Sequence, residues 1–527
     1  MSQPGDLIIT NARVLNLQDG SARLSNLIIQ SGIITAINID VQSAALPVFD
    51  AEGAYALPGF IDTHVHLLMA GESLLQTDLS NVKSRQQFED AVADAHAQLP
   101  RGEWLIARGW SNENWHDHAL PDATWLAAAG DRPAIAWRMD THVCLVNHAV
   151  IEQLNLSQPD PPGGHIVRDQ HGNPTGLFLE AAAWQLVQQI VPPLSSEMRS
   201  RALNAAVVHA HQHGITAVGS MEYAATVSDV INPARQNLSL RIFLTLLDRT
   251  LPLDFTFSET FDNDDRCAII GYKSFLDGTI GSRTARMLDA YSDDRGNHGM
   301  WCEHALDHTL DRWIHEVASR GWQPAMHAIG DAAFRRALDA IATLDADVRR
   351  HVRPRIEHAQ QIDQQDLLRL KALDGMMLSM QPLHRADDGR YLERRVGSER
   401  LMGSFACVSL LDHGAVIAFG SDWPIVSCNP IKGMHAAITG RTLDDTIFQP
   451  QENITPLDAI RGWTKVAAHA LHAEKFIGTL ELGKAGDVVL LDRDPCSIDW
   501  NDEQPSVVAT VAAGVIVSRD GAASGAL

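Results

Sequence analysis

Cysteine and long apolar runs are both scarce in this chain. Its 527 residues include six cysteines, with no C-x-x-C spacing among them. A disulfide framework is therefore not indicated, and a reducing cytoplasm is the expected location, whereas a periplasmic location would require a separate leader. No apolar run reaches the roughly 18 residues of a membrane-spanning helix, and residues 1–20 lack the pattern of a secretory signal. We expect a cytoplasmic protein without a membrane partner.

Positive charge is also in short supply. The chain carries 42 Lys and Arg against 65 Asp and Glu, which gives a net charge of −23. Phosphate backbones and anionic lipids repel such a protein, and no cluster of basic residues offsets the imbalance. Nucleic acid is therefore not expected as a partner. The hydrophobic fraction of 45% and the charged fraction of 20% are typical of a globular protein with a large core.

Eight short apolar runs, each ending in a polar or glycine-containing turn, recur between residues 57 and 424. They are LPGFIDTHVH, GITAVGSMEY, LSLRIFLTLLD, CAIIGYKSFLDG, WQPAMHAIGD, RPRIEHAQ, GMMLSMQPLH and AVIAFGSDWP. Helical segments such as LDRWIHEVASRG lie between several of them. This alternation predicts an α/β fold, a (β/α)8 TIM barrel over residues 58–469. A doubly wound open sheet would give the same alternation, so the strand count leaves that alternative open.

The two ends of the chain and one internal interval depart from this rhythm. Residues 1–57 and 470–527 hold short Val- and Ile-rich runs between turns, and neither end has enough strands to stand alone. We predict one small composite β-sandwich domain built from both termini. The interval of about residues 70–200, after the first strand, is too long for a loop and contains strand and helix patterns of its own. It predicts a large inserted subdomain.

Two histidines close the first predicted barrel strand. Alternate side chains of a strand share a face, so His64 and His66 point the same way. They also lie at the strand's carboxyl end, where barrel enzymes place their chemistry. This spacing allows both rings to bind one metal ion, with Asp62 as an outer group that orients a ligand. Two hydrogen-bonded core histidines are the alternative.

The same H-x-H spacing occurs elsewhere in poorer settings. His209, His211 and His213 end a helical stretch before Gly214, and cations favour a helix C-terminus. His209 and His213 have the i,i+4 spacing that can chelate an ion, but no carboxylate motif accompanies them, so a metal site there is disfavoured. The pair at residues 116 and 118 lies in a polar loop and indicates a surface or pocket-rim position.

Polar residues also end four of the other predicted strands. They are Lys273, His327, His358 and Asp422. A single such residue is usually a hydrogen-bonded core group. Six polar groups at one mouth are hard to explain by packing, because each costs about 1–3 kcal/mol when it is buried without a partner. A shared metal ion would provide most of them with a partner at once.

The order of these residues resembles a known family. H-x-H on the first strand, Lys on the fourth, His on the fifth and sixth and Asp on the eighth is the pattern of the amidohydrolase superfamily. The segments PGFIDTHVH, GYKSFLDGTIGSRTA, HAIGDAA, RIEHAQ and FGSDWP resemble its YtcJ-like branch, the amidohydrolase 3 group. The tail IGTLELGKAGDVVLLDRDP is similar to the superfamily's C-terminal β-domain. The resemblance covers nearly the whole chain.

This resemblance implies a hydrolytic metal centre of one or two ions. It implies these metal ligands: His64, His66, Lys273, His327, His358 and Asp422. Lys273 would bridge two ions as its N6-carboxylate; an unmodified lysine would instead indicate one ion, with Glu180 as a candidate acidic partner. Imidazole and carboxylate ligands suit Zn²⁺, with Fe²⁺ or Mn²⁺ as alternatives. A homodimer is expected on family grounds alone.

The implied activity is a metal-dependent hydrolase that cleaves a carbon–nitrogen bond other than a peptide bond, in a small amide, N-acyl or N-formyl substrate. Asp422 would act as general base toward a metal-activated hydroxide and then as acid toward the leaving nitrogen. The sequence has no G-x-S-x-G motif and no cysteine in a context that would lower its pKa. Covalent catalysis is therefore not indicated. A deaminase, a cyclic amide or ester hydrolase, and a non-catalytic regulatory protein on the same fold are the alternatives.

Three further residues are predicted to contact the substrate. Arg283 has the fork geometry for a substrate carboxylate or carbonyl, and a loop-stabilising ion pair is the alternative. His384, placed at the end of the seventh strand, is a candidate hydrogen-bond partner of the tetrahedral oxyanion. His142 lies in the insertion and is a candidate for projecting toward the pocket, with a structural hydrogen bond as the alternative.

Overall fold

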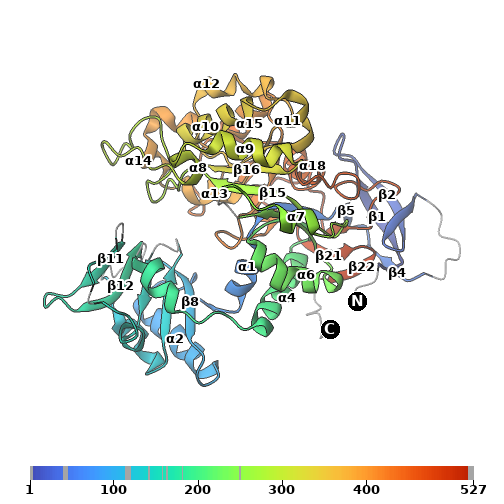
Figure 1. Cartoon of the computed structure of the whole chain (residues 1–527). Coiled ribbons are helices and arrows are strands. Elements are labelled where there is room, and N and C mark those ends of the chain that lie inside the picture. Colours follow the sequence, from blue (N-terminus) through green and yellow to red (C-terminus); the bar gives the residue numbers. More distant parts are fainter. Residues whose placement is uncertain are drawn as a thin grey trace. The chain divides into compact units, whose positions relative to one another are not determined.

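The computed structural model describes residues 4–38, 46–112, 115, 120–139, 143–156, 158–161, 164–180, 182–247 and 251–519. These fall into two compact units (Figure 1). The first unit joins Met1–Leu67 to Val207–Leu527, and the second is Leu68–Ala206. The predicted insertion interval lies inside the second unit, and the predicted domain boundaries themselves stay predictions.

A closed parallel barrel is the centre of the first unit. Its strands, in spatial and chain order, are β6 (Phe60–Val65), β13 (Ile215–Glu222), β14 (Arg241–Leu246), β15 (Cys267–Phe275), β16 (Gln323–Ala328), β17 (Arg355–His358), β18 (Met377–Met380) and β19 (Ile417–Phe419). The ring closes beyond β19, where Asp422 N donates to His64 O at 2.7 Å and His66 N donates to Trp423 O at 2.8 Å. The predicted α/β fold with a (β/α)8 TIM barrel is confirmed, and the open-sheet alternative is wrong.

Burial on both faces explains why these segments are strands with nearly continuous apolar runs. All residues of β13, β14 and β16 are buried, as expected for a parallel sheet covered by helices. The helices between them are amphipathic. In α9 (Leu310–Ser319), Leu310, Trp313, Ile314, Val317 and Ala318 are buried, which is the spacing of one helix face.

The helices of the first unit vary in length. They are α5 (Ala224–Thr226), α6 (Asn232–Ala234), α7 (Thr256–Thr260), α8 (Glu303–Leu306), α9, α10 (Asp331–Ala342), α11 (Ala346–Val352), α12 (Gln364–Leu367), α13 (Pro382–Asp388), α14 (Leu392–Val396), α15 (Cys407–Asp412), α16 (Pro430–Thr439), α17 (Pro456–Gly462) and α18 (Lys465–Ala470). The chain passes from one unit to the other within α1 (Leu67–Leu74) and within α4 (Ser196–Gln212).

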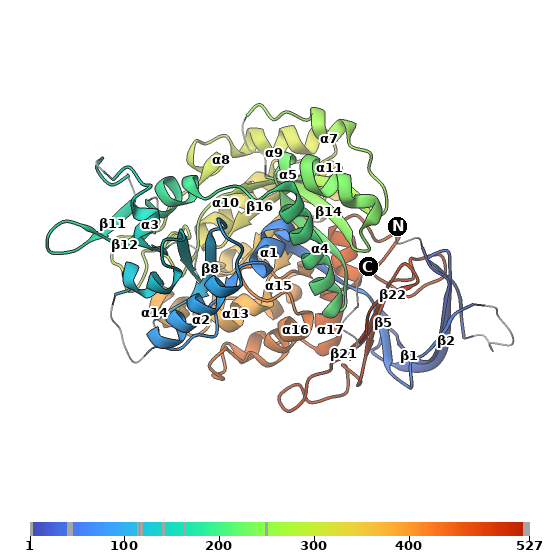
Figure 2. The ribbon, with the colours of Figure 1, turned by 90° about the horizontal axis from the view of Figure 1, so that it is seen from below.

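Strands from both ends of the chain form one sheet beside the barrel. They are β1 (Leu7–Leu15), β2 (Ala22–Gln30), β3 (Ile33–Ile37), β4 (Val48–Asp50), β5 (Tyr55–Pro58), β20 (Val488–Leu491), β21 (Val507–Ala512) and β22 (Val515–Arg519). Strand β20 pairs antiparallel with β5, which places the red C-terminal strands next to the blue N-terminal ones (Figure 2). Their apolar residues share one buried core. The structure thus joins both chain ends in one eight-stranded sheet, where the sequence predicted a composite β-sandwich domain.

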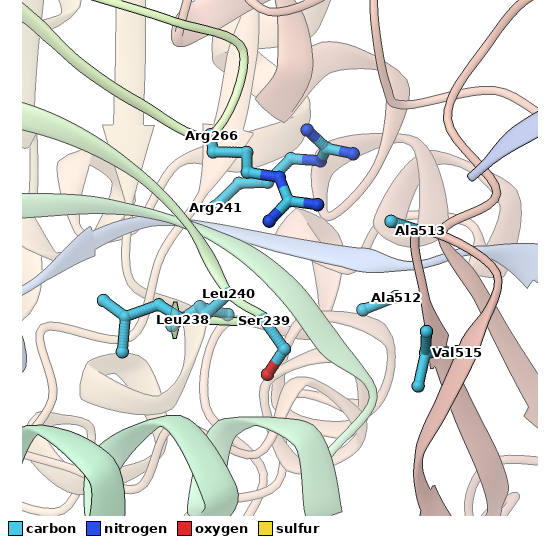
Figure 3. Close-up of a pocket in the computed structure, with 8 residues that line it drawn as sticks. All are labelled: Leu238, Ser239, Leu240, Arg241, Arg266, Ala512, Ala513 and Val515. Carbon is cyan, nitrogen blue, oxygen red and sulfur yellow. The ribbon is translucent and has the colours of Figure 1, made fainter. Parts of the chain in front are cut away.

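A buried ion pair connects this sheet to the base of the barrel. Arg241, at the start of β14, is 5% exposed, and its Nε lies 2.8 Å from Asp487 Oδ2. A small cavity lies beside Arg241 and the turn between β21 and β22 (Figure 3). It encloses about 10 Å³, which is room for one water molecule at most. This cavity is at the amino end of β14 and is too small to be a substrate pocket.

The second unit has its own sheet and core. Its strand order is β11 (Gly164–Arg168), β12 (Pro174–Glu180), β10 (Val143–Val146), β9 (Ala134–Arg138), β8 (Leu105–Trp110) and β7 (Thr77–Asp78). Two helices, α2 (Arg85–Gln98) and α3 (His148–Ile151), accompany it. Phe88, Trp110 and Trp125 are nearly inaccessible and make edge-to-face contacts in one core cluster. Among the residues described here, no helix is long and apolar enough to cross a membrane.

Candidate metal centre

Polar side chains meet at the carboxyl ends of the barrel strands. His64 lies near the end of β6, Lys273 near the end of β15, and His327 near the end of β16. His358 is the last residue of β17, and Asp422 follows β19 by three residues. Because the strands are parallel, these ends share one mouth of the barrel, where barrel enzymes carry their catalytic groups.

His64, His66 and Asp422 form a first group of potential metal ligands. The Nε2 atoms of both histidines lie 3.5 Å from Asp422 Oδ1. Their Nδ1 atoms have other partners: His64 Nδ1 is 2.7 Å from Glu357 Oε2, and His66 Nδ1 is 3.3 Å from Met221 O. Both partners only accept, so each Nδ1 carries a proton, and each Nε2 faces Asp422. This is the arrangement of metal-binding histidines, and the residues fit a cation.

The charge states at this group also suit a cation. Burial, with the Lys273 cation, lowers the pKa of His64 to about 4, so its imidazole is neutral at neutral pH. Burial opposes ionisation of Asp422, but the histidines around it, His64 and His66 first, hold its pKa well below the usual value. The group therefore offers the neutral His64 imidazole, the His66 ring and one carboxylate, which is a donor set that Zn²⁺ accepts.

A second group shares the same carboxylate. His358, His384 and Asp422 have donor atoms within 4.8 Å of one another. His384 Nε2 lies 3.7 Å from Asp422 Oδ2, and the His327 ring is 4.4 Å from the His358 ring. At this mouth, three buried ring nitrogens have no hydrogen-bond partner among the described residues: His327 Nδ1, His358 Nδ1 and His384 Nε2. Such atoms are rare in native proteins, and a bound cation would account for at least part of this set.

Two backbone positions at the mouth are unusual. His358 and Asp422 have φ angles of 75° and 64°, in the left-handed region that favours glycine. Such conformations cost of order 1 kcal/mol or more each and concentrate at functional sites. Here they turn both side chains into the mouth at the point where their strands end.

Lys273 lies directly against the first group. Its side chain is 1% exposed, and Nζ is 2.9 Å from His64 Nε2, the nitrogen that faces Asp422. A buried ammonium at this position would repel a cation bound by His64. The geometry thus places the lysine where an N6-carboxylate could reach a metal ion, and its chemical state stays a proposal.

A buried ion pair between Arg355 and Glu357 orients the His64 ring, and the sequence did not predict it. Arg355 and Glu357, both fully buried, alternate along β17, with Arg355 Nε 2.9 Å from Glu357 Oε1. Burial raises the pKa of Glu357, but Arg355 and His64 outweigh it and hold that pKa at about 2. Strict strand alternation would put Glu357 and His358 on opposite faces. The left-handed His358 breaks the alternation, so both reach the mouth.

Asp277, two residues after β15, was also missed. It is 2% exposed and accepts backbone hydrogen bonds from Ile329 at 3.0 Å and from Gly330 and Arg286 at 2.8 Å. Burial raises its pKa to about 7 despite these bonds. Its Oδ1 is 3.5 Å from His327 Nε2, so it helps to orient that ring. The only sequence signal was its position in FLDG, beyond a strand end.

Asp62 ties the first strand to the segment that carries Asp422. Its Oδ1 accepts from Ser421 N at 2.9 Å and from His64 N at 3.1 Å. Burial raises its pKa to about 7. Asp62 therefore orients the backbone at His64 and next to Asp422. It makes no hydrogen bond to the side chain of either candidate ligand among the described residues.

The residues predicted to contact the substrate lie in different settings, and their substrate roles stay predictions. Arg283 forms a two-point ion pair with Asp293, with N–O distances of 3.0 and 2.9 Å, which is the loop-stabilising alternative. His384 lies in the first turn of α13, not at a strand end as predicted, yet it reaches the mouth. His142 lies outside the described residues, as do His116, His118 and the side chain of Glu180.

Comparisons with known proteins agree with this fold. Residues 47–518 match the model of an amidohydrolase family, Amidohydro_3. The chain is 32% identical over 468 residues to the putative amidohydrolase YtcJ of Bacillus subtilis (strain 168), with 85% of each chain covered. It is 25% identical over 521 residues to the N-substituted formamide deformylase of Arthrobacter pascens, covering 94% of this chain and 95% of the relative.

One solved structure has the same fold over nearly its full length. It is an uncharacterized metal-dependent hydrolase from Pyrococcus horikoshii OT3, with a TM-score of 0.75 and 25% identity, covering 94% of this chain and 99% of that one. The barrel and its clustered donors thus define a metal-dependent hydrolase. Since the family model spans most of the sequence, the chain belongs to the amidohydrolase family, as its motifs indicated.

Proposed function

We propose that this protein hydrolyses a carbon–nitrogen bond other than a peptide bond, in a small amide, N-acyl or N-formyl compound. The observation that carries the proposal is one carboxylate, Asp422, common to two groups of histidine donors at the barrel mouth. The similarity to a formamide deformylase over nearly the whole chain supports an N-formyl or N-acyl substrate.

In this proposal His64, His66 and Asp422 hold one divalent cation, Zn²⁺ first, with Fe²⁺ or Mn²⁺ as alternatives. A second cation would use His327 and His358 and require Lys273 as its N6-carboxylate. The orphaned, buried Nδ1 atoms of His327 and His358 support this assignment. When bound, a divalent cation supplies Lewis acidity and a water molecule of lowered pKa.

Asp422 moves the proton. Its carboxylate is ionised and faces the mouth, so it accepts the proton of the attacking water through one oxygen. It then passes that proton to the leaving nitrogen, which must be protonated before the carbon–nitrogen bond breaks. One carboxylate thus performs both transfers.

In this proposal His384 binds the carbonyl oxygen of the substrate. The Gln360 amide donates to His384 Nδ1 at 3.1 Å, so the ring proton resides on Nε2. That N–H has no hydrogen-bond acceptor among the described residues and lies near Asp422. A donor there stabilises negative charge that develops on the oxygen, and it distinguishes His384 from the metal ligands.

The test is a substrate panel on the metal-loaded protein. The panel comprises N-formyl amines, N-acyl amines, cyclic amides and aminopurines, with metal content measured in the same samples. We expect the wild-type protein to hydrolyse an N-formyl or N-acyl compound. The Asp422→Asn variant should lose this activity when turnover is expressed per bound metal ion. The surface variant Asp502→Asn is the matched control. A fully loaded protein that is inactive on the N-formyl and N-acyl compounds, or an Asp422→Asn variant with normal turnover, would overturn the proposal.

A further inference from the structure

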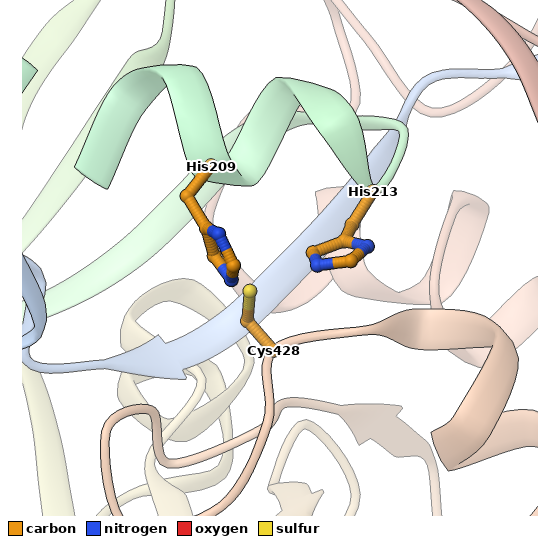
Figure 4. Close-up of side chains that lie close together, drawn as sticks. All are labelled: His209, His213 and Cys428. Carbon is orange, nitrogen blue, oxygen red and sulfur yellow. The ribbon is translucent and has the colours of Figure 1, made fainter. Parts of the chain in front are cut away.

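A third group of metal-binding residues lies away from the barrel mouth. His209 is in the last turn of α4, His213 follows the end of that helix, and Cys428 lies between β19 and α16. Their donor atoms are all within 4.8 Å of one another. Figure 4 shows the two rings on the side of the helix that faces the Cys428 thiol. Residues more than two hundred positions apart thus converge on one point.

The two histidines are available as ligands. They are one helical turn apart, with ring centroids 4.7 Å apart. Burial lowers the pKa of both, that of His213 to about 4, so both rings are neutral at neutral pH. Neutral imidazoles spaced i,i+4 on a helix are a recurrent chelating pair.

The third residue adds a sulfur donor in a protected position. Cys428 is 1% exposed, and it has no disulfide. Burial, with the Asp62 carboxylate, raises its thiol pKa well above the usual value, so the free protein holds a thiol there. The nearby charges are Asp62 on the Cys428 side and Lys432 on the His213 side.

We propose that His209, His213 and Cys428 form a second Zn²⁺ site, separate from the hydrolytic centre, with a fourth ligand from solvent. Two imidazoles and one thiolate are a donor set of borderline softness that favours Zn²⁺ over Mg²⁺ or Ca²⁺. On binding, the Cys428 thiol releases its proton to solvent and a sulfur–metal bond forms, with no redox change. The site neither uses nor requires the ligands at the mouth.

Such an ion would hold the segment that carries Asp422. The Trp423 ring stacks on His209, with centroids 5.0 Å apart and an interplanar angle of 24°. The carbonyl of Trp423 accepts from His66 N, and Asp422 immediately precedes it. Cys428 belongs to the same segment, between β19 and α16. A metal bound to these residues therefore joins the end of α4 to the loop that positions Asp422.

X-ray absorption at the zinc edge of the loaded wild-type protein tests this directly. We expect a sulfur scatterer at about 2.3 Å, because the mouth groups contain no sulfur donor. A spectrum with nitrogen and oxygen scatterers alone would overturn the proposal. The measurement needs no turnover, so an inactive protein does not affect it.

Cobalt substitution with matched variants assigns the sulfur. Co²⁺-loaded wild-type protein should show a near-ultraviolet thiolate charge-transfer band and lose one bound metal per chain in Cys428→Ser. The control Cys496→Ser removes a half-buried cysteine of the composite β-domain and should keep the band and the ion. A band that persists in Cys428→Ser would refute the assignment. If Cys428→Ser does not fold, His213→Gln replaces it with the same expected loss.

Discussion

Replacing Glu357 by Gln is the sharpest test of how the barrel interior supports the candidate metal centre. Glu357 is fully buried, and its two oxygens face different cations or donors: Oε2 is 2.7 Å from His64 Nδ1 and Oε1 is 2.9 Å from Arg355 Nε. The Arg355 guanidinium makes no hydrogen bond among the described residues, so this carboxylate is the charge paired with it. A glutamine keeps the shape but removes the charge that pairs with Arg355 and faces His64.

The expected cost follows from these contacts. Removing one partner of a buried ion pair typically destabilises a protein by about 3–5 kcal/mol, because the other charge stays buried without compensation. Loss of the carboxylate that orients a metal-binding histidine weakens metal affinity by about 10–100-fold, or about 1.4–2.7 kcal/mol. We therefore expect Glu357→Gln to lower both the free energy of unfolding of the metal-free protein and its affinity for Zn²⁺.

Two assays separate the two effects. Denaturant unfolding in the presence of a chelator measures stability, and competition with a metal indicator measures affinity. The double variant Arg355→Met/Glu357→Met removes both charges, so it should recover much of the stability while the metal affinity stays low. The exposed variant Glu503→Gln, which breaks a surface ion pair with Arg493, should change neither quantity. A loss below about 1 kcal/mol in Glu357→Gln, with unchanged affinity, would refute the reasoning.

Three further predictions concern the metal, the mouth and one loop. His64→Ala should remove the mouth metal and turnover together, measured by elemental analysis and hydrolysis; normal metal content would contradict the ligand assignment. A chelator should abolish hydrolysis and added Zn²⁺ should restore it, and a chelator-resistant rate would exclude a metal-dependent reaction. The two-point bond from Arg283 holds the pKa of Asp293 at about 2, below the usual 3.8. Its stabilisation, at most about 1 kcal/mol after solvent screening, should be present above pH 4 and lost as the pH falls toward 2. Unfolding of wild type and Asp293→Asn should therefore differ at pH 7 and coincide at pH 2, and a pH-independent difference would count against it.

The alternation of strands and helices could be predicted because its information is local, whereas the choice of a closed barrel over an open sheet came from the family resemblance. Each of the eight strands is a short apolar run that ends in a turn, and burial on both faces makes these runs continuous. The composite sheet followed from two chain ends that each held too few strands. Polar residues at the strand ends, such as His64 and Asp422, could be predicted to meet because parallel strands bring their carboxyl ends to one mouth.

Other parts of the site depend on backbone conformations that sequence patterns do not encode. The left-handed φ of His358 brings Glu357 and His358 to the same mouth, against strand alternation. His384 reaches Asp422 from the first turn of α13, whereas the sequence pattern placed it on a strand. In each case one residue's dihedral angle or the start of one helix decides which way a side chain points.

The sequence by itself thus determined the alternation of strands and helices, the joining of both termini and the polar residues that end most of the barrel strands, because these follow from patterns over neighbouring residues. Only the tertiary structure decided which side chains meet across long stretches of chain. The contact of Glu357 with His64, and of Cys428 with His209 and His213, arises from chain closure and loop conformation. No local pattern carries that information, because the partners are distant in sequence and their approach is set by packing of the whole barrel.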